Sequence, residues 1–467
     1  MALYHENSEI ATVSDLSLFS VPPTQVAVTK TRVQNYYPVS EYGQSDSPIE
    51  FNIPGNGLEY ISLKDTKLFL KLKITKTTKD KDKETVSTAN TAGTPADKTK
   101  KKTEEVITPP INVGPINLTL QSLWSQIDVY LNEKLVSAGG NNYPYKAYLQ
   151  TLLNYGADAK TSQLQNQLYY KDTPKYMDTN DCLKGANQGL LVRTKYFAKD
   201  KVVDLFGPLH IDFFQCPRYL LNNVSLRLKL YKTSKDFFLM CNGSTSDYKV
   251  KIEEAILKVT KVTVSPSITV GHAAALKQTT AKYPIKKVEV KAISIAKGSH
   301  GVSLDDIWLG KVPSKVIICF VNSSAMSGNS KLNPYNLQHF GASQIACYLN
   351  GESAPAAPIK LKFNKDSHYG SNYMEAYETI FSGTQVMGDD YGSDIGRDDV
   401  PAGYFLTVFN FEPVTNLDSQ VWNLKQSGNL RIVVDFSIPL EQTVNMIVYG
   451  EFPDLIRIDE TRNIIMQ

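Results

Sequence analysis

The stretch "SLWSQIDVYLNEKLVS" (residues 122–137) recurs in altered form as "FGASQIACYLNGES" (residues 340–353). Both copies contain Ser-Gln-Ile, followed at the same spacing by Tyr-Leu-Asn. The copies stand in opposite halves of a 467-residue chain, which is long enough for two domains that each bury a core. Self-similarity of this kind predicts that one structural unit is present twice.

When Ser125 is placed on Ser343, the repeat has the two-residue period of a β-strand, in which successive side chains point to opposite faces. In the first copy, one face carries Ile127, Val129 and Leu131, and the other carries Gln126, Tyr130 and Asn132. In the second copy, the corresponding faces carry Ile345, Cys347 and Leu349, and Gln344, Tyr348 and Asn350. We therefore expect a strand with one buried face in each half. Cys347 stands where the first copy has valine, so it is expected to be a small buried hydrophobe and not a nucleophile.

The sequence after each copy of the strand also repeats. Asn132-Glu133 and Asn350-Gly351 predict turns, and the second pair is a favoured two-residue hairpin turn. "YKAYLQTLLNYG" (residues 145–156) spaces its tyrosines and leucines as an amphipathic helix does, and residues 376–383 are its expected counterpart. Each half then ends in another apolar strand, "NNVSLRLKL" (residues 222–230) or "GNLRIVVDF" (residues 428–436).

Short alternating or apolar runs without long helices between them predict an all-β sandwich in each half. The clearest runs are residues 66–74, 224–232, 286–295 and 430–438. The small and polar stretch at residues 265–284 separates the two sets of strands and is the expected boundary.

Composition excludes several classes of protein. The formal net charge of +3 gives no reason to expect nucleic-acid binding, which usually leaves a strongly basic domain. The five cysteines are scattered and form no C-x-x-C pair, which favours synthesis in a reducing intracellular compartment. The N-terminus does not have the pattern of a secretory signal, and no window approaches the ~18 apolar residues of a membrane helix.

Two polar segments have functional alternatives. Residues 79–102 contain Val86 as their only large apolar side chain and are expected to form a solvated, mobile loop, with polyanion binding or nuclear import by Lys98 and Lys100–Lys102 as the alternative. Residues 386–400 contain Gly-Asp-Asp, as polymerase metal sites do, but the glycines and serine around it favour a polar loop. Its aspartates (Asp389, Asp390, Asp394, Asp398 and Asp399) are a candidate calcium site without EF-hand spacing.

No catalytic, cofactor-binding or metal-ligating residue is assigned. The six histidines show no H-E-x-x-H spacing, and the chain has neither a P-loop nor a G-x-S-x-G elbow, so no enzyme activity is expected. A carbohydrate- or receptor-binding β-sandwich is the main alternative function, with the tyrosine-rich residues 141–148 as its candidate surface. The helical spacing of Tyr148 and Tyr155 favours packing instead.

Long collinear blocks resemble major capsid proteins of Polinton/Maverick elements and the related adintoviruses. The blocks are residues 15–31, 47–63, 122–156, 403–413 and 429–464. The family resemblance implies an all-β double jelly roll, two eight-stranded sandwiches in tandem with short helices in connecting loops. The expected divisions are an N-terminal arm (1–47), a first jelly roll (48–264, with the lysine-rich insertion 75–108), a second jelly roll (265–453) and a C-terminal tail (454–467).

The resemblance also implies a function. Three copies would form a homotrimer with pseudo-sixfold outline that tiles an icosahedral viral shell, in contact with neighbouring capsomers and with penton and minor capsid proteins. The expected location is the virion capsid, after synthesis inside the host cell with assembly in the cytoplasm or nucleus. The arm is expected at the inner surface of the shell or between subunits, and no sequence-specific nucleic-acid binding or membrane span is expected.

Overall fold

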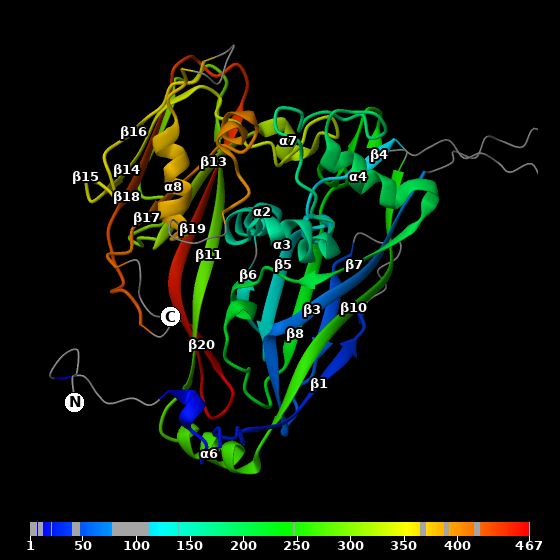
Figure 1. Cartoon of the computed structure of the whole chain (residues 1–467), viewed down its shortest axis with the longest axis vertical. Helices are drawn as coiled ribbons and strands as arrows, with labels where there is room; N and C mark the ends of the chain where they lie inside the picture. The colour runs from blue at the N-terminus through cyan, green and yellow to red at the C-terminus, as the bar shows by residue number, and fades with distance from the viewer. Residues whose placement is uncertain are drawn as a thin grey trace, which may run out of the picture.

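The computed structural model describes residues 7, 13–19, 21–39, 47–76, 112–138, 140–245, 248–364, 370–386, 392–414 and 421–466. These residues form two β-sandwiches that lie side by side, with helices between them and in the long connections (Figure 1). Within this part of the chain, no helix is long and apolar enough to cross a membrane.

The first half contains most of the helices. Its strands are β1 (Val28–Tyr36), β2 (Ile49–Ile53), β3 (Glu59–Lys76), β4 (Val113–Pro115), β5 (Trp124–Leu131), β6 (Lys134–Ala138), β7 (Val202–Pro208), β8 (Leu226–Lys232), β9 (Leu239–Cys241) and β10 (Tyr248–Val264). Its helices are η1 (Ser14–Leu16), α1 (Thr119–Ser122), α2 (Tyr143–Asn154), α3 (Ala157–Thr161), η2 (Gln163–Gln167), α4 (Gln188–Phe197), η3 (Ala198–Asp200), η4 (Asp212–Gln215) and α5 (Lys235–Phe238).

The second half begins after the helix α6 (Pro266–Leu276). Its strands are β11 (Ala281–Ile295), β12 (Gly301–Leu304), β13 (Lys315–Asn322), β14 (Ala342–Leu349), β15 (Glu352–Ser353), β16 (Ile359–Lys360), β17 (Leu406–Asn410), β18 (Leu430–Phe436), β19 (Val444–Ile458) and β20 (Ile464–Met466). Its helices are α7 (Ser323–Gly328), α8 (Met374–Thr384) and η6 (Arg397–Ala402).

The two halves have the same sheet topology. In the first, sheet A has the order β1-β10-β3-β7 and sheet B the order β2-β8-β5-β6. In the second, sheet D has the order β11-β19-β13-β17 and sheet E the order β12-β18-β14-β15. Each strand of sheets A and B therefore has a counterpart at the same place in sheets D and E, in the same chain order. The fold is a double jelly roll, as the family resemblance implies.

Strand alternation builds each core. On β3, Leu68, Leu70, Leu72 and Ile74 are fully buried, whereas the lysines between them are half-buried or exposed. β8 and β18 show the same alternation. Because the period of two matches the pleat, these strands bury one face in the core and keep the other more polar, whereas β13 of sheet D is buried on both faces.

The repeated phrase occupies the same strand of both sandwiches. β5 pairs with β8 and β14 pairs with β18, and the register shifts beside Ser125 in the first pair and beside Ser343 in the second. The expected inward positions are buried in both strands, except that Leu349 is only partly buried. Cys347 is 1% exposed and has no disulfide partner, as expected of a small core hydrophobe.

The repeated asparagines close equivalent turns. Asn132 and Asn350 both have positive φ angles, 44° and 52°, as does the residue after each. Their side-chain Oδ1 atoms accept hydrogen bonds from the backbone N–H of Ser225 and Asn429, at 2.8 and 2.9 Å. Ser225 and Asn429 directly precede β8 and β18, so each asparagine ties its hairpin to the start of the neighbouring strand. The shared Asn is structural in both halves.

The ends of the two sandwiches differ from the predicted divisions. The resemblance places residues 28–36 in the N-terminal arm, but they form β1, which pairs with β10 at the edge of sheet A. β1 is exposed along most of its length, so it lacks the apolar alternation that identifies a half-buried strand. At the other end, β19 runs past residue 453 to Ile458, and β20 folds back on it, so the predicted tail is part of sheet D.

The connections show one further difference. The stretch between the two sets of strands contains the eleven-residue helix α6, which the small and polar composition did not indicate. The predicted mobile loop at residues 79–102 lies outside the described residues, as do residues 77–108 of the lysine-rich insertion. The predicted helices at residues 145–156 and 376–383 are present as α2 and α8.

Candidate functional site

The contact between the two sandwiches, which we call the seam, is centred on α2 (Figure 1). Every residue of α2 except Asn154 is buried, because the helix packs against both halves. Asn142, at its N-terminus, donates to the backbone oxygen of Val290 on β11 at 3.0 Å, and Gln150 donates to the hydroxyl of Tyr449 on β19 at 3.2 Å. The helix therefore belongs to the first half by sequence and to both halves by packing.

An aromatic cluster fills the seam beside α2. Tyr335, from the second half, is fully buried and stacks on Tyr148 with ring centroids 4.0 Å apart and an interplanar angle of 5°. Tyr145 and Phe237 meet the ring of Tyr335 edge-on, at 5.9 and 6.5 Å. The hydroxyl of Tyr335 lies 2.7 Å from that of Ser122. Tyr148 is thus a packing anchor, as its helical spacing predicts.

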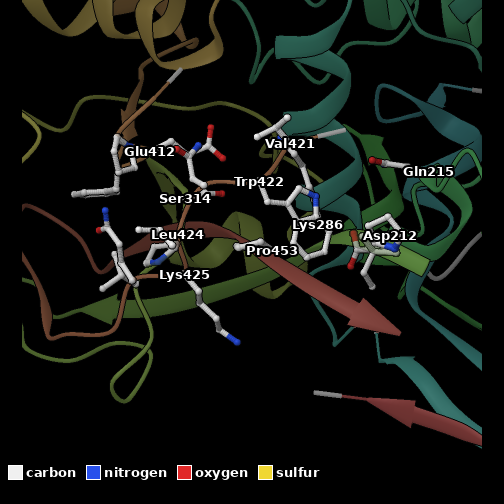
Figure 2. Close-up of a pocket in the computed structure, with 18 of the residues that line it drawn as sticks. Asp212, Gln215, Lys286, Ser314, Glu412, Val421, Trp422, Leu424, Lys425 and Pro453 are labelled. Carbon is white, nitrogen blue, oxygen red and sulfur yellow. The ribbon is translucent and has the colours of Figure 1, made fainter. Parts of the chain in front are cut away.

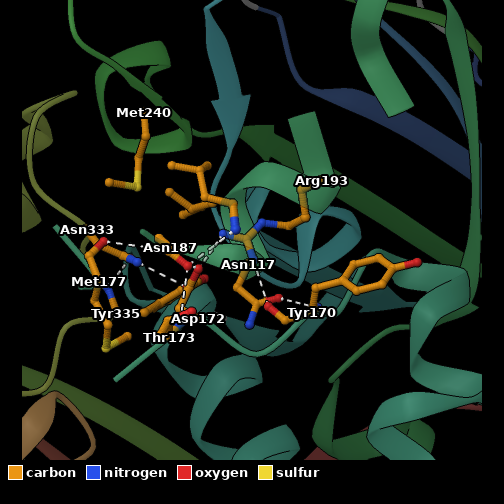
Figure 3. A network of polar contacts seen from close by, with 12 residues as sticks. Asn117, Tyr170, Asp172, Thr173, Met177, Asn187, Arg193, Met240, Asn333 and Tyr335 are labelled. Carbon is orange, nitrogen blue, oxygen red and sulfur yellow. Dashed lines mark hydrogen bonds and ion pairs between the residues drawn. The ribbon is translucent and has the colours of Figure 1, made fainter. Parts of the chain in front are cut away.

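A buried ion pair lies next to this cluster (Figure 3). Nη2 of Arg193, on α4, is 2.7 Å from Oδ1 of Asp172, and both side chains are inaccessible to solvent. The remaining guanidinium donors reach the backbone oxygens of Pro115 at 3.0 Å and Tyr170 at 2.7 Å. Asn187 donates to the same Asp172 oxygen at 2.9 Å. A buried charge pair is tolerated only when its hydrogen bonds are satisfied in this way.

The second half completes the network around Asp172. The side chain of Asn333 donates to Oδ2 of Asp172 at 3.1 Å, and the hydroxyl of Tyr404 donates to the Asp172 backbone oxygen at 2.7 Å. Nearby, Asp178 accepts from the backbone N–H of Asn333 at 2.8 Å and from the side chain of Asn336 at 2.6 Å. In these four hydrogen bonds the accepting aspartate belongs to the first half, and the donating residue belongs to the second half. This arrangement fixes the orientation of one sandwich against the other.

The aspartate-rich loop contributes to the seam. Nζ of Lys171 lies 2.8 Å from Oδ2 of Asp399 and 3.6 Å from Oδ1 of Asp394. Lys160, also from the first half, donates to the backbone oxygens of Leu152 and Ser393. Burial lowers the pKa of the Lys160 ammonium to about 8, although the charge of Asp394 opposes the shift. Lysines of the first half therefore hold this loop of the second.

The candidate calcium site in this loop is described only in part. Asp389 and Asp390 lie outside the described residues. Among the residues that are described, no three His, Cys, Asp or Glu side chains form a group that could hold a metal ion.

A second buried polar group lies at the base of α2. Nζ of Lys146 is 2.6 Å from Oδ1 of Asp212, and the other oxygen of Asp212 accepts from the backbone N–H of Val288 in the second half. His210 is buried beside them, with Nδ1 2.9 Å from Oε1 of Gln150. Burial, helped by the nearby positive charge of Lys146, lowers the pKa of His210 to about 4.

We expect His210 to make the protein sensitive to acid. Because the folded pKa lies below the ordinary value of 6.5, the unfolded chain binds the proton more tightly, and stability is lost as pH falls from 6.5 through 4. The loss at the acid limit is about 3 kcal/mol for this group. Thermal unfolding of the wild type and of His210→Gln between pH 7.5 and 4 tests this. The variant should show a smaller decrease in melting temperature, and equal decreases would contradict the assignment.

A cleft of about 360 Å³ opens at the edge of the seam (Figure 2). Prolines and apolar side chains dominate its lining, including Trp422 and Leu424, which are 50% and 90% exposed. Two of its charged groups form ion pairs with residues outside the lining: Asp212 pairs with Lys146, and Lys286 lies 3.0 Å from Glu451. The cleft therefore has the character of a packing surface.

The candidate sugar-binding surface is not available for a ligand. Within residues 141–148, Tyr143, Tyr145 and Tyr148 are at most 2% exposed and belong to the seam. Sequence reasoning missed Asp172, Arg193 and Asn333, because each stands alone in a loop or on a short helix and belongs to no motif. Their polar character would even argue against burial. Only the tertiary arrangement brings them together.

Comparisons with known proteins agree with this architecture. No family model matches the sequence. An uncharacterised protein from Caenorhabditis elegans is 22% identical over 456 residues, covering 96% of this chain and 99% of that protein. Among solved structures, the neighbours are viral double jelly-roll major capsid proteins, so the chain has the fold of that class.

Three of these structures match nearly the whole chain. A chain of the Sputnik virophage has a TM-score of 0.64 and 11% identity, covering 99% of this chain and 93% of its own. A chain of the PBCV-1 virus capsid has a TM-score of 0.56 and 12% identity, with coverage of 96% and 98%. The mavirus major capsid protein has a TM-score of 0.51 and 12% identity, with coverage of 100% and 97%. At these identities the likeness is one of fold.

Proposed function

We propose that this chain is a structural major capsid protein whose copies form homotrimeric capsomers that tile an icosahedral viral shell. The observation that carries the proposal is the match of both sandwiches together, over 99% of the chain, to a chain of the Sputnik virophage. A match of that extent includes the relative placement of the sandwiches as well as each sandwich alone. The role is structural, and no catalytic step is assigned to any residue.

The seam supports this role physically. A ring of three copies presents six similar sandwiches, and its outline approaches a hexagon only if the angle between the two sandwiches of each copy is fixed. Buried hydrogen bonds from Asn333 and Tyr404 to Asp172, and the stacked pair of Tyr148 and Tyr335, hold that angle. A flexible linker between two sandwiches would not give a regular lattice.

Exposed apolar side chains support assembly. Leu16, Leu18, Phe19 and Val21 of the N-terminal segment are between 69% and 102% exposed. At the cleft, Leu424 is 90% exposed and Trp422 is half exposed. Large apolar side chains gathered in one exposed segment mark a candidate interaction site. We therefore assign both segments to contacts between copies or with other shell proteins, including penton and minor capsid proteins.

The proposal extends to origin and location. The resemblance of residues 15–31, 47–63 and 429–464 to capsid proteins of Polinton/Maverick elements and adintoviruses supports a gene of that kind. Its product would be made inside the host cell and reside in the virion capsid. The division into two jelly-roll units, with the halves meeting near residues 265–284, is part of the same proposal.

The mass of the purified protein in solution tests the proposal. Three copies of the 52.0 kDa chain should give a particle of about 156 kDa that persists at ~1 μM, because obligate interfaces of ~2,000 Å² or more dissociate little at that concentration. Sedimentation velocity or mass photometry measures this directly. A single species at the mass of one chain would contradict the proposal.

A further inference from the structure

The helix α8 is the counterpart of α2 in the second half, but its own chain covers it much less. Each helix is the first one after the repeated strand of its half, and each precedes an edge strand, β7 or β17. Every residue of α2 except Asn154 is buried, whereas on α8 only Ala376, Ile380 and Gly383 are buried. Gly383 lies against Val408 of β17. One side of α8 is therefore seated on the second sandwich, and the other side faces outward.

The outward side of α8 is acidic. Glu375, Glu378 and Ser382 follow one another at three- and four-residue spacing, so they lie on one face of the helix, and all three are exposed. Glu378 accepts a hydrogen bond from the hydroxyl of Ser382 at 3.1 Å, but neither glutamate forms an ion pair with a residue that the structure describes. Beside this face, the half-buried rings of Tyr377 and Phe381 meet edge-on, with centroids 5.0 Å apart. The helix thus presents two carboxylates next to a partly uncovered aromatic pair.

The strands that cover α2 in the seam also have uncovered counterparts. α2 bonds to Val290 on β11 and to Tyr449 on β19, and the places of these two strands in sheet A are taken by β1 and β10. β1 is exposed along most of its length, and its Val33 is 62% exposed. β1 and β10 lie on the side of the first sandwich that is turned away from the second half (Figure 1). Both surfaces that meet in the seam therefore occur a second time, on opposite sides of the molecule, without each other.

The outer face of sheet A carries charges that complement α8. Lys67 on β3 is the direct cross-strand partner of Lys258 on β10, and neither lysine forms an ion pair with a described residue. The acidic groups nearby are engaged with Lys71, which lies 2.6 Å from Glu254 and pairs across the strands with Asp204. Like charges directly opposite each other destabilise a sheet, so carboxylates from outside the chain would relieve the repulsion between Lys67 and Lys258.

We infer that α8 of one copy packs against the outer face of β1 and β10 of the next copy, as α2 packs against β11 and β19 within a copy. In this contact Glu375 and Glu378 face Lys67 and Lys258. The inference rests on the proposed function, because copies of a two-unit chain close into a ring when the second half of each meets the first half of the next. Contacts within a copy and contacts between copies then use equivalent surfaces, which is what a hexagonal outline requires.

Charge reversal on α8 tests the inference on the full-length chain. In about 0.1 M NaCl, E375K/E378K should raise the dissociation constant of the trimer about 100-fold or more, because lysines then face lysines across each contact. The same double variant combined with K67E/K258E should recover most of that affinity, since the charges on the two sides are exchanged. Sedimentation velocity over a dilution series measures the constants, and melting temperatures show that each variant is folded.

The control and the outcomes separate this inference from the proposed function. E441K/E460K is the matched control, since it changes two exposed glutamates in other loops of the same half by the same net charge, and it should remain trimeric. A wild-type trimer together with an E375K/E378K variant that keeps the wild-type dissociation constant would overturn the inference alone. A weakened E375K/E378K trimer that K67E/K258E does not restore would overturn the assignment of sheet A as the partner surface. A monomeric wild type would overturn both the inference and the proposed function.

Discussion

Replacing Arg193 with alanine is expected to lower the free energy of unfolding by about 3–5 kcal/mol, because it leaves the Asp172 carboxylate buried without its counter-charge. Both side chains are inaccessible to solvent, and the guanidinium also satisfies two backbone oxygens. Asp172 also accepts a hydrogen bond from Asn333 of the second half, so the variant should loosen the seam and weaken formation of the proposed trimer. Thermal unfolding and solution mass measure the two effects.

Two controls make this result interpretable. Lys195→Ala changes an exposed cation on the same helix, so its melting temperature should stay close to that of the wild type. The pair Arg193→Met and Asp172→Leu, made together, should be more stable than Arg193→Ala alone, because no buried charge remains unpaired. A melting temperature for Arg193→Ala equal to that of Lys195→Ala would show that the ion pair does not hold the seam.

Replacing Tyr335 with alanine is expected to cost a similar amount, about 3–5 kcal/mol, as large-to-small changes of buried aromatic residues do. The ring lies in the seam between Tyr148, Tyr145 and Phe237, so its removal leaves a cavity between the two halves. Tyr335→Phe keeps the ring and loses only the hydroxyl contacts with Ser122 and the backbone oxygen of Pro144, so it should cost about 1 kcal/mol.

The comparison of the two Tyr335 variants separates packing from hydrogen bonding. Tyr176→Ala, at a half-exposed tyrosine outside the cluster, is the matched control for loss of a ring. Equal melting temperatures for Tyr335→Ala and Tyr335→Phe would contradict the importance of the stacked pair. The proposed trimer should also be less stable in Tyr335→Ala than in Tyr335→Phe, because the angle between the sandwiches is less well held.

The fold could be predicted from features with local causes. Ile127, Val129 and their counterparts follow the strand period, and Asn132 and Asn350 adopt the positive φ angles that their turns require. These signals depend on residues that are near one another in the sequence, so the repeat can be recognised from the sequence alone. The identity of the duplicated unit as a jelly roll came from the resemblance to capsid proteins and agrees with the sheet topology.

The remaining features depend on tertiary context. β1 has few apolar side chains, because an edge strand can be held by backbone pairing to β10 alone. The helix α6 leaves most of its side chains exposed, so it lacks an amphipathic pattern. The network of Asp172, Arg193 and Asn333 joins residues that are far apart in sequence, and no periodicity or motif marks such a site.

Electron microscopy of the purified full-length protein tests the central claim most directly. If the two sandwiches of each copy are fixed by the seam and three copies close into a ring, single particles should show a hexagonal outline with threefold symmetry. Two-lobed particles of one chain, without larger assemblies at ~1 μM, would contradict the account.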